Sequence, residues 1–501
     1  MTVIDGYILG FSNILTLQYF LAVLIGVIMG IIFGAVPGIT TAMGMTFVLP
    51  ITFTMELLPA LGLLLGMYIG GITGGHLSAI LLNIPGNPAS IATTLDGHPM
   101  ARRGEAPRAL GIALLCSFIG GMFSLVILFT FSPLLARVAL MAGPIEYFSI
   151  TLVSLLLISS LSGKSLRRGI IAGCFGIALT TIGSSPIDGG FRYTFGIPAL
   201  TGGLSLIPVL IGVFAITEIL DTAELKLPMI KPREYKLRGF GLTLQEFKSQ
   251  IGNIIRSALI GTGIGVLPAI GGNVSALLAY SATKNRSKTP EKFGTGHIEG
   301  LVAPEVANNA GTGGAMVPLL TLGIPGDAPT AVLMVALMIH GVQPGPLLFS
   351  RNAEIVYTIF AFLIMANILM LVSEYYGMRL FLRVLAVPKH ILMPVILVFC
   401  VVGAFSVNSR LFDVGSVIVI GLLAYGMKKF DYPHAPFILG FVLGGMFETN
   451  LRRALIFTRG DVLEFFRRPV SAVAFIIFIL VIVLTIRAEI KAQKKSATTK
   501  T

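Results

Sequence analysis

Charged residues are scarce in this chain of 501 residues, of which Asp, Glu, Lys and Arg together make up only 12%. A soluble domain of this length needs far more charge to cover its surface. Hydrophobic residues reach 55% and the mean hydropathy is +0.90. Apolar runs of roughly 15 to 25 residues, the length that a bilayer core requires, recur from Ile14 to Ile486. We therefore predict an all-α polytopic membrane protein.

Cysteine is also rare, and its placement argues against a metal or redox site. Cys116, Cys174 and Cys400 lie isolated in apolar segments, without CxxC or metal-ligand spacing. We interpret them as small core residues. The histidines share no ligand spacing either, so no transition-metal site is expected; they include His76, His297, His340, His390 and His434.

Several catalytic signatures are missing. The chain has no Walker A motif, which leaves ATP-driven transport by this chain unsupported. It has no HExxH or GxSxG motif, which argues against the familiar intramembrane hydrolases. We expect no enzymatic activity and no cofactor beyond a coupling ion. The N-terminus also lacks the basic region of a cleavable signal, so the first apolar run is expected to be retained.

Positive charge is in excess, with a net charge of +13. The Lys and Arg residues lie in short loops between apolar runs, which is how topology is set in membrane proteins. We therefore expect no nucleic-acid partner and use the positive residues to orient the chain.

Two stretches of the chain share one order of Pro and Gly interruptions, about 231 to 240 residues apart. The first contains Gly34-Ala-Val-Pro37-Gly38-Ile-Thr40-Thr41, then Thr73-Gly-Gly75, then Asn83-Ile-Pro85-Gly86-Asn87-Pro88. The second contains Gly265-Val-Leu-Pro268-Ala-Ile-Gly271-Gly272-Asn273, then Thr312-Gly-Gly314, then Gly323-Ile-Pro325-Gly326-Asp327-Ala-Pro329. The chain is predicted to be an internal duplication with broken helices.

The apolar runs predict roughly 11 to 15 membrane segments in two repeats. The predicted spans are 14–34, 38–54, 57–82, 109–132, 147–162, 169–184 and 197–220, then 251–265, 268–283, 300–340 (broken), 353–376, 391–406, 413–427 and 435–450, with a last run at 471–486. This gives a first repeat over 1–220, a cytoplasmic linker over 221–250, a second repeat over 251–450 and an extra segment with a polar tail over 451–501.

The loops predict that the two repeats have opposite orientation. Loop 50–60 has no Lys or Arg, whereas its counterpart 284–304 has four, and this bias alternates along each half and reverses between halves. Positive loops face the cytoplasm, and inverted repeats are common in secondary transporters. Loop 451–469 carries five Arg on the predicted outside, so either segment 435–450 does not cross or the end of the chain departs from the repeat.

Broken membrane helices provide binding groups. A half-helix N-terminus favours a carboxylate, and freed carbonyl, hydroxyl and amide oxygens suit Na⁺. The predicted substrate-binding residues are Pro37, Gly38, Thr40, Thr41, Asn83, Gly86, Asn87, Gly271, Gly272, Asn273 and Gly326. The predicted cation-binding residues are Thr73, Asn273, Ser275, Asn308, Asn309, Thr312 and Asp327.

Each of these residues also has a structural interpretation. Isolated Gly and Pro in membrane helices often serve only close packing or a kink. Asp327 either caps its helix or binds a cation or proton, and the pair Asn308 and Asn309 either binds a cation or makes interhelical hydrogen bonds. Asp96-Gly-His98-Pro99 is expected to turn the chain. A final group near span ends is expected to reach water or form ion pairs: Glu56, Glu218, Glu374 and Glu448.

At these motifs the sequence resembles the large membrane subunit of the tripartite tricarboxylate transporters, the TctA family. The resemblance covers nearly the whole chain. It rests on Gly34-Ala-Val-Pro-Gly-Ile, Asn83-Ile-Pro-Gly, Asp96-Gly-His-Pro, Ala303-Pro-Glu-Val-Ala-Asn-Asn-Ala and Gly323-Ile-Pro-Gly.

The resemblance implies a permease of the bacterial inner membrane that imports organic acids, including tricarboxylates such as citrate and dicarboxylates, with an ion gradient. It implies a small membrane subunit (TctB-like) and a periplasmic solute-binding protein (TctC-like) as partners, with a homo-oligomer left open. We expect symport with Na⁺ by alternating access. The alternatives are H⁺ coupling through Asp327, an ion channel built from re-entrant segments and, least favoured, an intramembrane enzyme.

Overall fold

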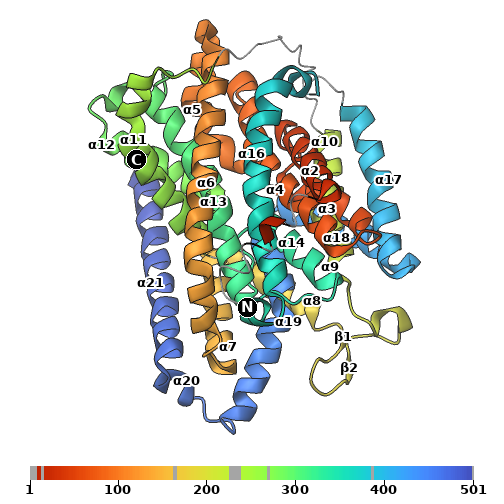
Figure 1. The fold of residues 1–501 in the computed structure, drawn as a ribbon. Helices are drawn as coiled ribbons and strands as arrows, with labels where there is room; N and C mark the ends of the chain where they lie inside the picture. Colours follow the sequence, from red (N-terminus) through yellow and green to blue (C-terminus); the bar gives the residue numbers. More distant parts are fainter. Residues whose placement is uncertain are drawn as a thin grey trace. The chain divides into compact units, whose positions relative to one another are not determined.

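The protein is almost entirely helical, as predicted (Figure 1). The computed structural model describes residues 8, 10–12, 16–161, 166–224, 239–267, 271–384 and 389–498. Within these ranges, five helices are long and apolar enough to cross a membrane: Leu17–Ala35, Leu57–Leu82, Pro88–Ala139, Ala353–Met378 and Leu411–Lys429.

The chain forms two compact units, and each contains parts of both sequence halves. Unit 1 comprises Met1–Ala136 and Glu218–Val407, and unit 2 comprises Arg137–Thr217 and Asn408–Thr501. The elements wholly or mostly in unit 1 are α2 (Leu17–Ala35), α3 (Thr41–Thr52), α4 (Leu57–Leu82), η1 (Pro88–Ser90), α5 (Ile91–Met100), η2 (Ala101–Glu105), α6 (Ala106–Ala139), α10 (Thr217–Glu224), α11 (Leu244–Gly265), α12 (Gly271–Arg286), η5 (Pro290–Lys292), α13 (Ile298–Leu322), α14 (Ala328–Ile339), α15 (Pro346–Arg351), α16 (Ala353–Val384) and α17 (Lys389–Asn408). Those of unit 2 are α7 (Pro144–Leu161), α8 (Leu166–Thr180), β1 (Gly183–Ser184), β2 (Phe191–Arg192), η3 (Pro198–Leu200), α9 (Leu206–Ile211), η4 (Gly212–Ile216), α18 (Leu411–Lys429), α19 (His434–Phe457), α20 (Glu464–Arg467) and α21 (Pro469–Thr498).

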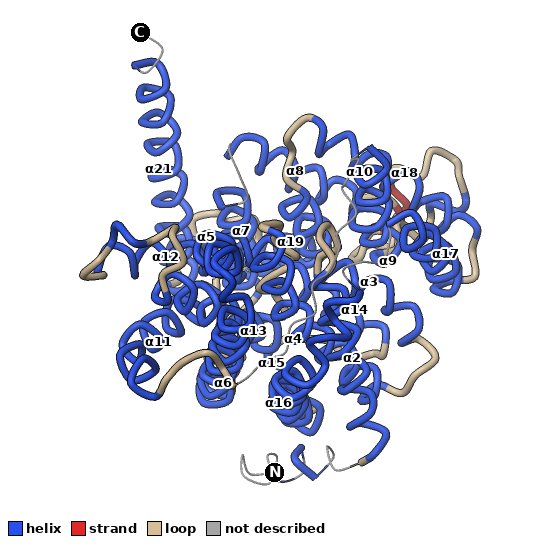
Figure 2. The backbone as a smooth tube through the Cα atoms, turned by 90° about the horizontal axis from the view of Figure 1, so that it is seen from above, coloured by secondary structure: helices blue, strands red, loops and turns tan. Residues whose placement is uncertain are grey.

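Most predicted spans coincide with helices, and the differences have local causes. The predicted loop 97–108 is helical: α5 continues through the π-helix η2 into α6, with a kink at Gly104, whose φ is +87°. The span predicted at 169–184 ends at Thr180, before the short antiparallel pair β1–β2 that Figure 2 shows as strand. The predicted linker 221–250 ends within α11, which starts at Leu244; residues 225–238 lie outside the described part of the chain.

The first helix pair of each half is held together by the same close contact. In the first half, α2 packs on α4, and a Cβ atom on Gly34 would lie 2.1 Å from the carbonyl oxygen of Gly71. In the second half, α11 packs on α13, and a Cβ atom on Gly265 would lie 2.6 Å from the carbonyl oxygen of Gly311. Small residues allow this backbone approach. The two halves therefore repeat in structure as well as in sequence.

In unit 2, helices of the two halves also pack in matching pairs. α8 packs on α19, and α18 packs on α9 and η4. Several arginines of loop 451–469 bind carboxylates within this unit: Arg452 lies 2.9 Å from Glu448, and Arg468 lies 3.2 Å from Glu146. Arg452 and Arg453 lie in α19, which continues to Phe457, so the predicted loop 451–469 begins later than expected.

Candidate functional site

Both predicted breaks after the long helices are present, and they have the same geometry. α4 ends at Asn83 and α13 ends at Gly323, and both residues have left-handed backbone, with φ of 58° and 70°. A residue in this conformation ends a helix. In each copy Ile-Pro-Gly follows, and the chain then starts a new helix.

The new helices begin at the predicted capping residues. Asn87 accepts a hydrogen bond from the backbone N–H of Ser90 at 3.1 Å, and Asp327 accepts one from the backbone N–H of Thr330 at 2.9 Å. Pro88 follows the cap Asn87 directly. The backbone N–H at this first helical position has no partner within the helix, so a proline, which lacks the N–H, loses no hydrogen bond there. Asn87 and Ser90 occupy the same positions in the first copy of the repeat as Asp327 and Thr330 in the second. Local sequence alone was sufficient to predict these helix starts.

Each break folds back against the long helix that precedes it. A Cβ atom on Gly86 would lie 2.9 Å from Cα of Gly75, and a Cβ atom on Gly326 would lie 2.4 Å from Cα of Ala315. Only glycine fits at such a distance. In the first copy, Asn87 Nδ2 also donates to the backbone oxygens of Gly71 and Ile72, at 3.1 and 3.0 Å. These contacts hold irregular backbone inside unit 1.

The earlier break, between α2 and α3, adds hydroxyl groups to the same region. Pro37 and Gly38 form the turn, in which Gly38 has a φ of +92°. Thr40 caps α3 by accepting from the N–H of Met43 at 3.2 Å. Thr41 packs against Gly71, and its buried hydroxyl has no hydrogen-bond partner. Unsatisfied buried polar groups are uncommon and need an explanation.

Five of the predicted cation-binding residues are buried on α4, α12 and α13: Thr73, Ser275, Asn308, Asn309 and Thr312. Thr73 donates to Oδ1 of Asn309 at 2.8 Å, and Thr312 donates to the backbone oxygen of Asn309 at 2.7 Å. Ser275 donates to the backbone oxygen of Ala307 at 3.3 Å. Asn308 is buried, and neither polar atom of its side chain has a hydrogen-bond partner.

The counterpart break between α11 and α12 is described only in part. α12 begins at Gly271. Pro268 and the side-chain positions of Gly271, Gly272 and Asn273 lie outside the described residues, so those predictions stay untested.

Asp327 is surrounded by hydrogen-bond donors. Its Oδ1 accepts from the N–H of Thr330 at 2.9 Å and from the hydroxyl of Thr330 at 2.8 Å, and its Oδ2 accepts from the hydroxyl of Tyr68 at 2.7 Å. Donors of this kind stabilise the ionised carboxylate. The geometry of Asp327 matches a helix cap, which the sequence left as one of its open alternatives.

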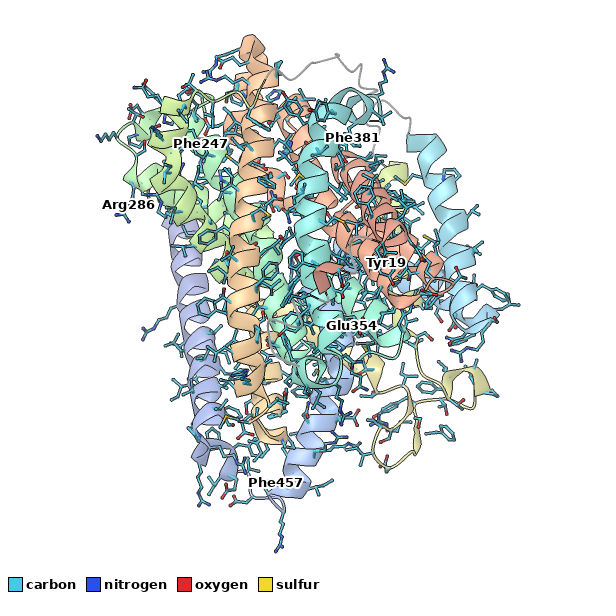
Figure 3. The ribbon with its side chains drawn as sticks, viewed as in Figure 1. Tyr19, Phe247, Arg286, Glu354, Phe381 and Phe457 are labelled. Atoms are coloured by element: carbon cyan, nitrogen blue, oxygen red, sulfur yellow. The ribbon has the colours of Figure 1, made fainter. Side chains whose placement is uncertain are left out.

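A second group of buried titratable side chains in unit 1 was not predicted from the sequence. His76 on α4 lies 2.6 Å from Glu374 on α16 and 3.6 Å from Glu305 on α13, and all three side chains are fully buried. As predicted, Glu374 lies near the end of its span, which reaches Met378, and it pairs with His76 instead of reaching water. Figure 3 shows how far α16 extends between Glu354 and Phe381. Pairing across distant helices leaves no local signal in the sequence.

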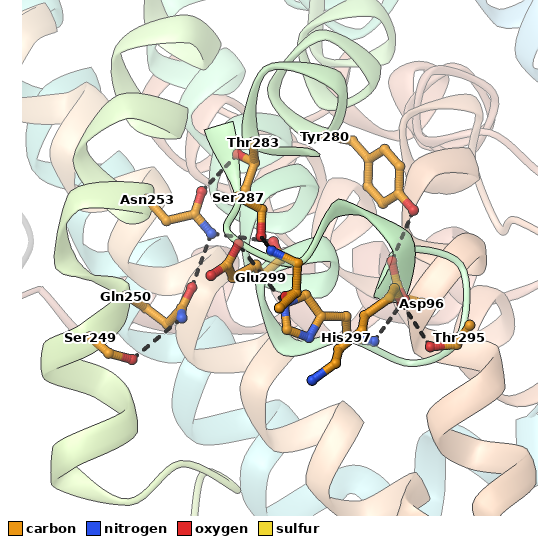
Figure 4. Close-up of polar contacts among 12 residues, drawn as sticks. Asp96, Ser249, Gln250, Asn253, Tyr280, Thr283, Ser287, Thr295, His297 and Glu299 are labelled. Atoms are coloured by element: carbon orange, nitrogen blue, oxygen red, sulfur yellow. Dashed lines mark hydrogen bonds and ion pairs between the residues drawn. The ribbon is translucent and has the colours of Figure 1, made fainter. Parts of the chain in front are cut away.

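Asp96 has a larger structural role than turning the chain, which is what the sequence predicted for it. Its Oδ1 accepts from the backbone N–H groups of Gly294, Gly296 and His297 at 3.0, 2.8 and 2.7 Å, and its Oδ2 accepts from the hydroxyl of Tyr280 at 2.9 Å (Figure 4). This carboxylate fastens the loop before α13 to α5. Unlike a turn residue, Asp96 itself lies inside helix α5.

A cavity of about 280 Å³ lies elsewhere, in unit 2. Its lining includes Thr180, Ser184, Gly203 and Phe441, and it contains no charged side chain and no predicted site residue. Because the predicted site residues and the matched breaks lie in unit 1, we place the candidate site there.

The chain is similar to a known family and to two proteins of Agrobacterium vitis. The sequence profile of the tripartite tricarboxylate transporter TctA family matches residues 20–439. A protein of Agrobacterium vitis described as an uncharacterized 52.8 kDa protein in the TAR-I ttuC′ 3′ region is 35% identical over 99% of this chain and 98% of its own length. A second, described as an uncharacterized protein in the TAR-II ttuC′ 3′ region, is 36% identical over 47% of this chain and 97% of its own length. No solved structure matches the chain.

Proposed function

Because the chain belongs to the tripartite tricarboxylate transporter TctA family, we propose that it is the large permease subunit of a Na⁺-coupled importer of organic carboxylates. The observation that carries this proposal is the pair of matched breaks, at Asn83–Asn87 and Gly323–Asp327, in one unit; Gly86, Asn87 and residues 323–326 are buried, whereas Asn83 is exposed. Irregular backbone at membrane depth is tolerated where it is enclosed by protein or lines a water-filled cavity.

The carboxylate is bound by backbone and neutral side chains. The helices that start after Asn87 and Asp327 present the positive ends of their dipoles at the breaks. No Lys or Arg lies within the breaks. The unpaired hydroxyl of Thr41 and the unpaired amide of Asn308 supply polar groups that a ligand satisfies.

Sodium is bound by oxygen atoms next to the carboxylate. Oδ1 of Asn309, the hydroxyls of Thr73 and Thr312 and the free Oδ1 of Asn308 are hard ligands of the kind that alkali cations prefer. The cation offsets the charge of the anion, which lowers the cost of holding either ion away from bulk water. The residues come from α4 and α13, equivalent helices of the two copies.

Proton coupling through Asp327 is the second candidate. Both carboxylate oxygens of Asp327 already accept hydrogen bonds, from Thr330 and from Tyr68, in the geometry of a helix cap, which gives Asp327 a role that needs no proton transfer. We therefore assign Asp327 a capping role.

Substrate reaches the permease from a periplasmic binding protein, and a small membrane subunit completes the complex in the bacterial inner membrane. Alternating access moves the broken-helix elements relative to the rest of the permease. Membership of a tripartite transporter family supports these proposals.

Reconstituted uptake tests the proposal. The permease, its small subunit and the binding protein are placed in proteoliposomes, and uptake of labelled citrate and a panel of dicarboxylates is measured with and without an inward Na⁺ gradient. We expect at least one carboxylate to accumulate only with the gradient. Equal accumulation without Na⁺, or none for any carboxylate, contradicts the proposal.

A further inference from the structure

His76 lies between two glutamates in the interior of unit 1. Its Nε2 is 2.6 Å from Oε1 of Glu374, and its Nδ1 is 3.6 Å from Oε2 of Glu305. The 2.6 Å contact is not aligned as a hydrogen bond, but charge attraction at this distance does not require alignment. Three titratable side chains with no exposed surface therefore meet at one point.

The two glutamates differ in their hydrogen bonds. Glu305 accepts from the hydroxyl of Ser117 at 2.9 Å and from the hydroxyl of Thr93. These two donors favour its ionised form. Neither oxygen of Glu374 has a hydrogen-bond partner. Glu374 is therefore the carboxyl group that gains most from holding a proton.

Charge balance leads to the same conclusion. With His76 protonated and both glutamates ionised, the cluster carries one net negative charge in a buried site, which costs several kcal/mol. One further proton on Glu374 removes that charge. The described parts of α2, α3 and α14 contribute no charged side chain beside His76. The described residues also contain no group of His, Cys, Asp and Glu suited to a metal ion.

Of the other titratable groups nearby, one faces the cluster, and the rest face elsewhere or are already paired. Cys116 on α6 faces Glu305. Asp96 on α5 faces the loop before α13, and Asp327 pairs with Tyr68, about two turns along α4 from His76. Glu354, at the other end of α16, is exposed.

The cluster is connected to the first break. Gly75, the neighbour of His76, is the residue against which Asn87 and Ser90 pack: a Cβ atom on it would lie 2.2 Å from Nδ2 of Asn87 and 2.5 Å from Oγ of Ser90. Thr93, which donates to Glu305, is in the helix that starts at that break. A change in the charge of the cluster therefore acts on two residues that position the break.

We propose that His76 and Glu374, together with Glu305, form a buried proton-binding site separate from the Na⁺ and carboxylate site. His76 carries one proton as its positively charged form, the second proton binds Glu374, and Glu305 stays ionised. Its effect on transport rests on the proposed function, because the site adjoins the break that holds the carboxylate.

Infrared difference spectroscopy of the purified full-length chain during a pH titration tests the site directly. A protonated buried carboxyl group has a C=O stretching band that separates it from ionised carboxylates. We expect such a band in the wild type, its loss in Glu374→Gln and its retention in Glu354→Gln, the exposed control on the same helix. In His76→Gln the band should persist to higher pH by about one unit or more, because the neighbouring positive charge is gone.

If Glu374→Gln does not yield folded protein, Glu374→Asp also tests whether the C=O band belongs to residue 374. In that variant the band should shift in frequency. A wild type without the band, or a band unchanged by both substitutions at 374, overturns the proposal.

A dye that reports internal pH separates this site from the proposed function: citrate uptake by the wild type should acidify the vesicles, and uptake by Glu374→Gln should not. If citrate is not taken up at all, the proposed substrate class fails, and the infrared result still decides the proton site.

Discussion

Single residues at the breaks show which local signals predict structure. Asn87-Pro88 and Asp327-Ala-Pro329 predicted helix starts, and both residues cap a helix, because capping depends on neighbours within one turn. The contact between His76 and Glu374 could not be predicted, because it depends on how two distant helices pack. The roles of the predicted binding residues stay predictions.

Replacing Asp327 with Asn separates capping from proton transfer. Asn keeps the acceptor oxygen for Thr330, its amide nitrogen replaces the oxygen that accepts from Tyr68 and can donate to the Tyr68 hydroxyl instead, and Asn already occupies the equivalent position 87. We expect Asp327→Asn to melt near the wild-type temperature and to keep Na⁺-dependent citrate uptake. Asp327→Ala loses the cap, at a cost of about 1 kcal/mol, and leaves the Tyr68 hydroxyl without this acceptor. Loss of uptake in a folded Asp327→Asn protein would restore the proton-carrier alternative.

Glu246 should make the stability of the α11 N-terminus depend on pH. Its carboxylate accepts from the N–H and hydroxyl of Thr243 and pairs with Arg108 at 2.5 Å. The hydrogen bond from the Thr243 N–H, aided by Arg108, lowers the pKa of Glu246 below its usual 4.5. The stabilisation is therefore complete above pH 4.5 and is lost as pH falls through the lowered pKa.

Two substitutions at this position separate the contributions. Glu246→Gln keeps an acceptor for the Thr243 N–H but loses the charge, so the acid-dependent part of the melting temperature should disappear. Glu246→Ala should also lose the cap, about 1 kcal/mol at neutral pH. Thermal melting in detergent between pH 7 and pH 3 measures both effects. Identical pH profiles for the wild type and Glu246→Gln would contradict this assignment.

At the scale of elements, hydrophobic length predicted most helices well. A bilayer requires long apolar runs with internally satisfied backbone, so their limits are marked in the sequence. The prediction of helix limits failed in segments outside the apolar runs, where the chain does not have to cross a bilayer. The Arg-rich segment 101–105 continues a helix, and residues 183–192 contain the two short strands.

Glycines on one face of α11 should be sensitive to substitution, whereas those on another face should not. A Cβ atom on Gly261 would lie 2.3 Å from the backbone oxygen of Ala307, whereas one on Gly263 would have no atom within 4 Å. We expect Gly261→Ala to destabilise the protein by about 1 to 3 kcal/mol through overpacking. Gly263→Ala, the matched control, should be neutral or slightly stabilising. Thermal melting of both variants measures the difference, and equal melting temperatures would argue against close packing of α11 on α13.

At the scale of the whole molecule, the sequence repeat and the compact units divide the chain differently. The repeat separates residues 1–220 from 251–450, whereas unit 1 combines the breaks of both copies and unit 2 combines the later helices of both. The duplication was visible in the sequence because its Pro and Gly positions recur. The pairing of helices from different halves was not visible, because it depends on tertiary contacts.

The opposite orientation of the two copies is the claim on which the proposed site depends, since it brings two helix N-termini to one depth from opposite sides. Accessibility of single cysteines in intact cells tests it most directly. In a background lacking Cys116, Cys174 and Cys400, Thr54→Cys after α3 and Lys288→Cys after α12 mark equivalent exposed positions. An impermeant thiol reagent should label Thr54→Cys from outside and Lys288→Cys only after permeabilisation; labelling of both positions from the same side would contradict the inverted arrangement.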